Sequence, residues 1–181
     1  MPKLKTKSGA KKRFSLTASG SYDPDGTYSN ACHAAEVEVD IDIGKVEVKK
    51  YIVVEDAGLL INPMIVDGQI HGGIAQGLAN ALYEEIIYDK DGTILTTNLS
   101  DYLVPTMNEI PPIEIHHLET ITDFSITKAK GLGEGGLIGA PAAAINAVSD
   151  ALSEFDIDLL EMPISPQYIR DLIKESESYK Q

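Results

Sequence analysis

The sequence has 181 residues, which suits one ordinary domain but not two large ones. Its composition, 43% hydrophobic and 24% charged, excludes a disordered tail, a collagen-like chain and a coiled coil. The single cysteine excludes an internal disulfide framework and a multi-cysteine zinc or iron–sulfur site. Because there is no membrane-length apolar run and no signal-like N-terminus, we expect a cytoplasmic protein without a membrane partner.

The formal net charge of −13 is unevenly distributed. Residues 1–20 hold six Lys or Arg and no acidic residue, which leaves −19 on residues 21–181. Residues 21–181, the body of the chain, are acidic enough to repel phosphate backbones, which disfavours nucleic acid as a partner. The head begins MPKLKTKSGAKKRF and resembles the N-terminus of a small basic bacterial large-subunit ribosomal protein.

We predict that this basic head, residues 1–20, is disordered and foreign to the body, residues 21–181. A fusion, a mis-set start and an artificial chimera remain open as its origin. A ribosome-associated protein is a further alternative, but it depends on residues 1–20 alone, and the acidic body argues against it.

Hydrophobic periodicity predicts a hairpin and then a long helix in the first half of the body. Residues 35–43 alternate between apolar and acidic side chains, and a turn at Gly44 leads to a β-branched strand over residues 46–55. A helix is predicted over residues 66–85, because apolar side chains recur every four residues at Ile70, Ile74, Leu78 and Leu82.

The second half is predicted to hold a further hairpin, a strand and two helices. The hairpin spans residues 85–96, around Asp-Lys-Asp-Gly, and the strand spans residues 113–122. An Ala-rich helix covers residues 141–152, and a last helix has Ser165 as N-cap. Strands and helices do not alternate regularly, so we expect an α+β fold of β-hairpins packed with a Gly-rich and an Ala-rich helix.

The long helix contains four glycines, which is unusual because each costs about 1 kcal/mol relative to alanine. They are Gly68, Gly72, Gly73 and Gly77. Tight helix packing and the close approach of a flat ligand both explain such glycines. Gln69 is predicted to lie at the N-terminal end of this helix, where its amide and free backbone N–H groups would face a polar heterocycle or an anion.

The second candidate segment is KAKGLGEGG, residues 128–136. Glycines flank Glu134 on both sides, so its carboxylate is accessible and could act as a general base. An incidental acid in a surface turn is the alternative. The segment also matches the dinucleotide-binding pattern G-x-G-x-x-G, but there Pro141 would fall inside the helix, so we reject that interpretation. The histidines and Cys32 lack metal-ligand spacing, so no protein-ligated metal is predicted.

Several short motifs together resemble a known family. They are AEVEVD (35–40), DAG (56–58), INP (61–63), GQIHGGIAQG (68–77), ALYEE (81–85), DYLVPT (101–106), AKGLGE (129–134), GAP (139–141) and MPISP (162–166). In this order, they resemble the C-terminal part of the molybdenum-cofactor large subunit of the xanthine dehydrogenase, aldehyde oxidase and aerobic carbon monoxide dehydrogenase family. The fold implied is the C-terminal region of a molybdopterin-binding domain.

The resemblance implies an oxidoreductase that oxidises or hydroxylates a small molecule with oxygen from water. It implies Glu134 as the general base, and Gln69, Lys130, Gly131 and Gly133 beside a molybdenum–molybdopterin cofactor, the cytosine dinucleotide form being one option. FAD and [2Fe–2S] clusters would lie on partner subunits. Family subunits are much longer, so we expect the chain to be inactive without the remainder of the large subunit. The alternative is a non-catalytic fragment or chimera that folds without a cofactor.

Overall fold

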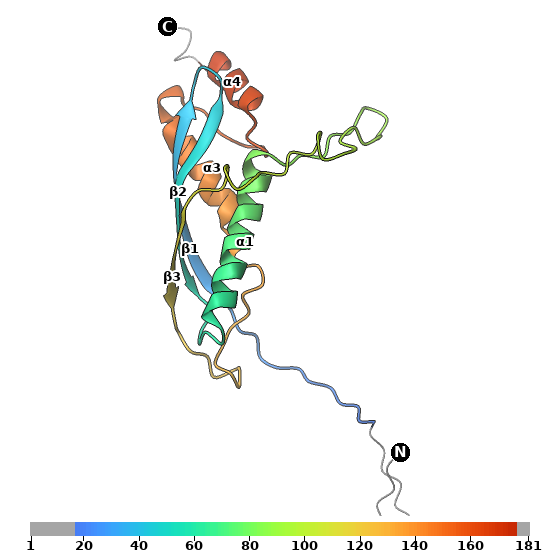
Figure 1. Cartoon of the computed structure of the whole chain (residues 1–181), viewed down its shortest axis with the longest axis vertical. Coiled ribbons are helices and arrows are strands. Elements are labelled where there is room, and N and C mark those ends of the chain that lie inside the picture. Colours follow the sequence, from blue (N-terminus) through green and yellow to red (C-terminus); the bar gives the residue numbers. More distant parts are fainter. Residues whose placement is uncertain (1–16, 177–181) are drawn as a thin grey trace, which may run out of the picture.

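The computed structural model describes residues 17–176, and residues 1–16 of the basic head lie outside that range. In chain order the elements are β1 (Asn30–Asp40), β2 (Lys45–Asp56), α1 (Pro63–Leu82), β3 (Ile113–Leu118), α2 (Gly135–Ile138), α3 (Ala140–Ala151), the 3₁₀ turn η1 (Ser153–Phe155) and α4 (Pro166–Glu175). Residues 17–29 form no helix or strand and trail away from the body (Figure 1).

The strands form one mixed sheet in the order β1-β2-β3. β1 and β2 pair antiparallel, whereas β2 and β3 pair parallel, and α1 lies in the crossover that parallel pairing requires. The helices α1 and α3 cover one face of the sheet (Figure 1), and the opposite face presents charged side chains such as Glu36, Glu38 and Glu114. The arrangement confirms the predicted α+β class.

The first strand is displaced from its predicted position. It begins at Asn30 and ends at Asp40, whereas the alternation predicted residues 35–43. It ends early because the Asp40 carboxylate accepts from the backbone N–H of Asp42 at 2.9 Å, and its carbonyl accepts from Gly44 at 2.7 Å. Gly44, with φ of +72°, completes this turn. Ile41 and Ile43 are therefore exposed in the turn and do not continue the buried face.

The long helix begins three residues before its predicted start. Asn62 is the N-cap and its side chain accepts from the Ile65 N–H at 3.3 Å, while Pro63 takes the first turn, where no N–H is needed. The helix ends at Leu82 because the Tyr83 and Glu84 N–H groups both turn back to the Ala79 carbonyl. This shift changes the position of Gln69, as described below.

Two β predictions were too long. The second hairpin forms its turn at Gly92, but its strands are reduced to the single bridge between Tyr88 and Ile94. This segment extends away from the body without a third strand beside it (Figure 1). β3 ends at Leu118 and not at residue 122, where its pairing with β2 stops at Asp56.

The core lies between the sheet and the helices and contains the residues that periodicity predicted. Ile70, Ile74, Leu78 and Leu82 of α1 are all buried in this core, and the Ala-rich helix contributes Ala140, Ala144 and Val148. The last helix begins as predicted, with the Ser165 hydroxyl accepting from the Tyr168 N–H at 3.2 Å. It closes the core with Ile169 and Ile173.

The four glycines of α1 divide into two pairs. A Cβ at Gly73 would lie 2.8 Å from the Gly136 carbonyl carbon, and one at Gly77 would lie 2.5 Å from the Ala140 Cβ. These two glycines therefore allow α1 to contact the backbone of α2 and the start of α3, as the tight-packing alternative predicts. Gly68 and Gly72 face open space, with no atom within 4 Å of an added Cβ.

The two adjacent glycines Gly72 and Gly73 should respond oppositely to alanine. We expect Gly73→Ala to destabilise the chain by about 1–3 kcal/mol, because backbone atoms of α2 cannot move aside easily. We expect Gly72→Ala to stabilise it by up to about 1 kcal/mol through helix propensity. Urea unfolding of both variants measures this difference, and an equal effect at the two positions would contradict the packing described.

Candidate functional site

The segment leading to Glu134 is attached to the end of the first hairpin. The Lys130 N–H donates to the Ala57 carbonyl at 2.8 Å, and the Leu59 N–H donates to Lys128 at 3.1 Å. Gly58 and Ala129 pair across this junction. Two stretches more than 60 residues apart in sequence, DAG and AKGLGE, thereby lie side by side.

Asp56 is the centre of this junction. One oxygen of its carboxylate, Oδ1, accepts from Gly58 N at 3.0 Å, Thr120 N at 3.1 Å and Lys130 Nζ at 3.2 Å. The Asp56 and Lys130 side chains are only 9% and 8% exposed. Burial alone would raise the pKa of Asp56, but hydrogen bonds from Thr120, Gly58 and Lys130 outweigh it and lower the pKa to about 2. Asp56 is therefore an ionised carboxylate that joins three segments.

The glycine-rich helix and the second candidate segment meet at Gln69. The Gln69 side-chain amide donates from Nε2 to the Gly133 carbonyl oxygen at 3.3 Å. Gln69 lies in the second turn of α1, because the helix begins at Pro63 and not at residue 66. The expectation of free backbone N–H groups around Gln69 was therefore wrong, since only the first turn of a helix leaves them unpaired. Its side chain is exposed and next to the glycine turn.

Gly131 and Gly133 present open backbone. No atom lies within 4 Å of a Cβ added at either residue, and both are exposed. Glu134 follows as the N-cap residue of α2, where its backbone carbonyl accepts from Leu137 N at 3.0 Å. Its side chain forms no N-cap hydrogen bond and is exposed. The carboxylate is therefore accessible, as its flanking glycines predicted, but the backbone that carries it is the start of a short helix and not a flexible turn.

The backbone after Glu134 is fixed by its contact with α1. A Cβ at Gly136 would lie 2.5 Å from the Ile70 carbonyl oxygen, so α2 is seated directly on α1. This contact and the Gln69 hydrogen bond place Gln69, Gly133 and Glu134 together on one surface of the molecule.

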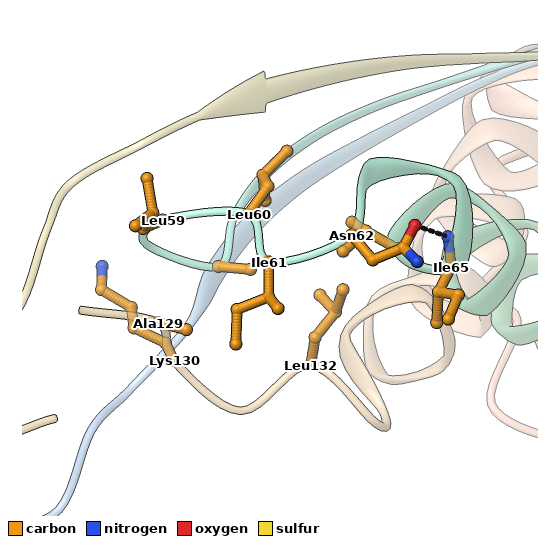
Figure 2. A pocket seen from close by; sticks show the side chains of 10 residues that line it. Leu59, Leu60, Ile61, Asn62, Ile65, Ala129, Lys130 and Leu132 are labelled. Carbon is orange, nitrogen blue, oxygen red and sulfur yellow. Dashed lines mark hydrogen bonds between the residues drawn. The ribbon is translucent and has the colours of Figure 1, made fainter. Parts of the chain in front are cut away.

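An apolar pocket of about 260 Å³ adjoins this surface. Figure 2 shows the loop Leu59–Ile61 on one side, Ala129–Leu132 on the other and Ile65 at the start of α1. The aliphatic lining is interrupted only by Asn62 and Lys130. The Lys130 ammonium forms an ion pair with Asp56, so Lys130 contributes no free charge to the pocket, and the pocket wall is apolar.

Sequence reasoning treated Asp56 as part of a motif and assigned it no role. The signal was present, since two acidic residues end a β-branched strand just before Gly58, which has φ of +66°. Within residues 17–176, no group of three His, Cys, Asp or Glu side chains is placed to bind a metal ion. No helix in that range has the length and apolar character needed to cross a membrane.

Comparison with known proteins identifies the family. The model of the molybdopterin cofactor-binding domain matches residues 3–111. The nicotine 6-hydroxylase large subunit of Paenarthrobacter nicotinovorans is 49% identical over 142 residues, which are 78% of this chain and 17% of that protein. The carbon monoxide dehydrogenase large chain of Afipia carboxidovorans is 34% identical over 149 residues, 82% of this chain and 18% of that protein.

Solved structures agree with this relationship. Quinoline 2-oxidoreductase from Pseudomonas putida 86 superposes with a TM-score of 0.80 at 46% identity, over 82% of this chain and 19% of that chain. The Cu,Mo-CO dehydrogenase gives a TM-score of 0.81 at 31% identity, over 85% and 20%. The chain thus spans about a fifth of the relatives it matches. It belongs to the molybdopterin cofactor-binding domain family and corresponds to a segment of the molybdopterin-binding large subunit of xanthine dehydrogenases, carbon monoxide dehydrogenases and aldehyde oxidoreductases.

Proposed function

We propose that this chain supplies the general base, Glu134, and part of the molybdopterin pocket to a molybdenum hydroxylase that oxidises or hydroxylates a small molecule. The observation that supports this proposal best is the hydrogen bond between Gln69 and Gly133. It joins the two segments that sequence analysis selected independently, and it does so beside an exposed carboxylate.

The residues present fit a pterin cofactor. Gly131 and Gly133 leave space that a Cβ would fill, so a flat heterocycle can approach their backbone closely. The Gln69 amide, exposed at the same place, can donate to and accept from a polar ring. When bound, the molybdenum cofactor supplies the redox chemistry by which oxygen from water reaches the substrate.

Glu134 performs the acid–base part of the reaction in this proposal. Its carboxylate accepts a proton as the carbon–oxygen bond of the product forms, and its backbone is held at the start of α2. Lys130 acts indirectly, since its pairing with Asp56 holds the turn that leads to Glu134. FAD and [2Fe–2S] centres on partner subunits would accept the electrons.

The rest of the large subunit completes the pocket in this proposal. Large apolar side chains are exposed at the start of α1, at Ile61, Met64 and Ile65. More are exposed along the arm between α1 and β3 (Figure 1), namely Ile86, Ile87, Tyr88, Ile94, Leu95, Leu99, Leu103, Val104 and Met107. An exposed apolar area this extensive is typical of a protein–protein contact.

The purified chain alone should therefore contain no molybdenum and should not turn over. We expect molybdenum, pterin and dye-linked oxidation to appear when the chain is co-expressed with the remaining part of a large subunit and the flavin and iron–sulfur subunits. The substrate panel comprises aldehydes, purines, carbon monoxide, nicotine and quinoline. Turnover by the chain alone would contradict the need for a remainder. A complete assembly that binds no molybdenum would favour the alternative of a non-catalytic fragment.

A further inference from the structure

A row of polar side chains crosses the helix-facing side of the sheet at the end nearest α2. Its centre is Glu55 on β2, whose side chain is fully buried, with 1% of the residue exposed. His117 on β3 is its direct partner across the parallel ladder. On the other side, β1 pairs Ala31 with Glu55, so His33 lies two residues along on the same face. A carboxyl group is thus flanked by imidazoles from both neighbouring strands.

This row holds all the buried side-chain polar atoms that have no hydrogen-bond partner within residues 17–176. They are Glu55 Oε1, Glu55 Oε2, His33 Nε2 and His117 Nδ1. The second nitrogen of each imidazole does form a hydrogen bond. His33 Nδ1 lies 2.8 Å from the Tyr51 hydroxyl, and His117 Nε2 lies 2.8 Å from Asp67 Oδ1. Native proteins satisfy almost all buried polar groups, so four together in one place indicate a ligand or a bound proton.

A cavity of about 180 Å³ opens onto the row from the side of β1. Both His33 and Glu55 line it, together with Asn30, Gly135 at the start of α2 and Gly139 between α2 and α3. A water molecule occupies roughly 30 Å³ in the liquid, so the cavity has room for several. Its lining includes the polar side chains of Asn30, His33 and Glu55, and buried water needs two to four polar partners.

The backbone at the two ends of α2 lies directly against the side chains of Glu55 and His33. A Cβ at Gly135 would lie 2.9 Å from Glu55 Oε1, and a Cβ at Gly139 would lie 2.5 Å from His33 Cδ2. Glycine at these two positions is what brings the backbone so near to both side chains. Because Gly135 directly follows Glu134, the row lies immediately beneath the turn that presents Glu134.

The charges around Glu55 favour its neutral form. Burial raises the pKa of Glu55, the Asp56 carboxylate raises it further, and His117 opposes them. Burial also lowers the pKa of His33, and the nearby Gly135 backbone, which does not reach hydrogen-bond geometry with the imidazole, opposes this shift. The nearby basic side chains already have other carboxylate partners, because Lys130 pairs with Asp56 and His117 contacts Asp67. Neither is therefore left to neutralise a Glu55 carboxylate alone.

We propose that Glu55, His33 and His117 form a buried acid site, which binds ordered water from the adjoining cavity and holds Glu55 as a neutral carboxylic acid beneath the Glu134 turn. A neutral carboxyl group is both donor and acceptor, so water can bridge it to His33 Nε2 on one side while its other oxygen remains available to His117 Nδ1. The site does not depend on Glu134 acting as a base, and it can be tested without a cofactor.

Infrared spectroscopy of the full chain tests the protonation of Glu55. At pH 7 we expect a carboxylic-acid C=O band that disappears in Glu55→Gln, which preserves the shape of the side chain. Glu154→Gln, which removes an exposed glutamate, should leave the band unchanged. No such band in the wild-type chain at pH 7, or a band that persists in Glu55→Gln, would overturn the proposal.

Two measurements on the unmodified chain keep the proposal testable if Glu55→Gln does not fold. The acid band should vanish only as the pH rises well above the usual carboxyl range, and it should shift in heavy water because the cavity admits solvent. A crystal structure at a resolution that shows ordered water should place molecules within hydrogen-bond distance of Glu55 and His33. A band lost already near pH 4.5, or a dry cavity, would overturn it.

Discussion

Glu134→Gln, made in the complete assembly, is expected to lower kcat by about 10²–10⁴-fold while molybdenum and pterin contents stay at the wild-type level. Glutamine keeps the size of the side chain and the start of α2, because Glu134 contributes to that start through its backbone carbonyl. It removes the carboxylate that would accept the proton. Steady-state kinetics and metal analysis of the same preparation measure the two quantities together.

The matched control is Glu154→Gln, which makes the same chemical change at an exposed residue of η1. It should leave kcat and KM unchanged. The pH profile separates a base from a structural residue, because loss of a base removes the acidic limb of kcat, whereas a distorted turn lowers activity at every pH. Full activity in Glu134→Gln, or loss of cofactor in that variant, would contradict the assignment while leaving the family membership intact.

Local sequence signals predicted those features of the fold that depend on residues within a single helix or strand. The fourfold spacing of Ile70, Ile74 and Leu78 predicted the buried face of α1, and Ser165-Pro166 predicted the start of α4. The start of α1 was misplaced because periodicity was weighed above the Asn62-Pro63 cap, which was equally visible in the sequence. The early end of β1 depends on side-chain geometry at Asp40, which alternation does not encode.

Contacts between distant segments were beyond the reach of such signals. Gln69 and Gly133 are 64 residues apart, and Lys130 and Asp56 are 74 apart. Neither pairing follows from spacing, because each depends on how α1 crosses the sheet and on the parallel register of β3. The same dependence separates Gly73, which packs on α2, from its exposed neighbour Gly72. The family resemblance predicted the candidate site residues, and the structure shows a buried ion pair that holds the segment leading to Glu134.

Asp56→Asn is expected to be strongly destabilising, with a loss of about 3–5 kcal/mol in the free energy of unfolding. Asparagine can still accept hydrogen bonds from Gly58 and Thr120, but it leaves the buried Lys130 ammonium without a counter-charge. The pKa of Asp56 is lowered from 3.8 to about 2 in the folded chain. Its contribution to stability is therefore complete above pH 4 and is lost as the pH falls through 2. Urea unfolding between pH 7 and pH 2 measures both effects.

The exposed pair Lys128–Asp123 supplies the control for this prediction. The Asp123 side chain is 92% exposed, so Asp123→Asn should cost far less stability than Asp56→Asn. Equal losses in the two variants, or an acid-dependent loss between pH 4 and pH 2 that persists undiminished in Asp56→Asn, would contradict the role given to the buried pair. If the prediction holds, Asp56→Asn in the complete assembly should also lower kcat, since the Ala57–Lys130 hydrogen bond and the Asp56–Lys130 pair together fix the segment that ends at Glu134.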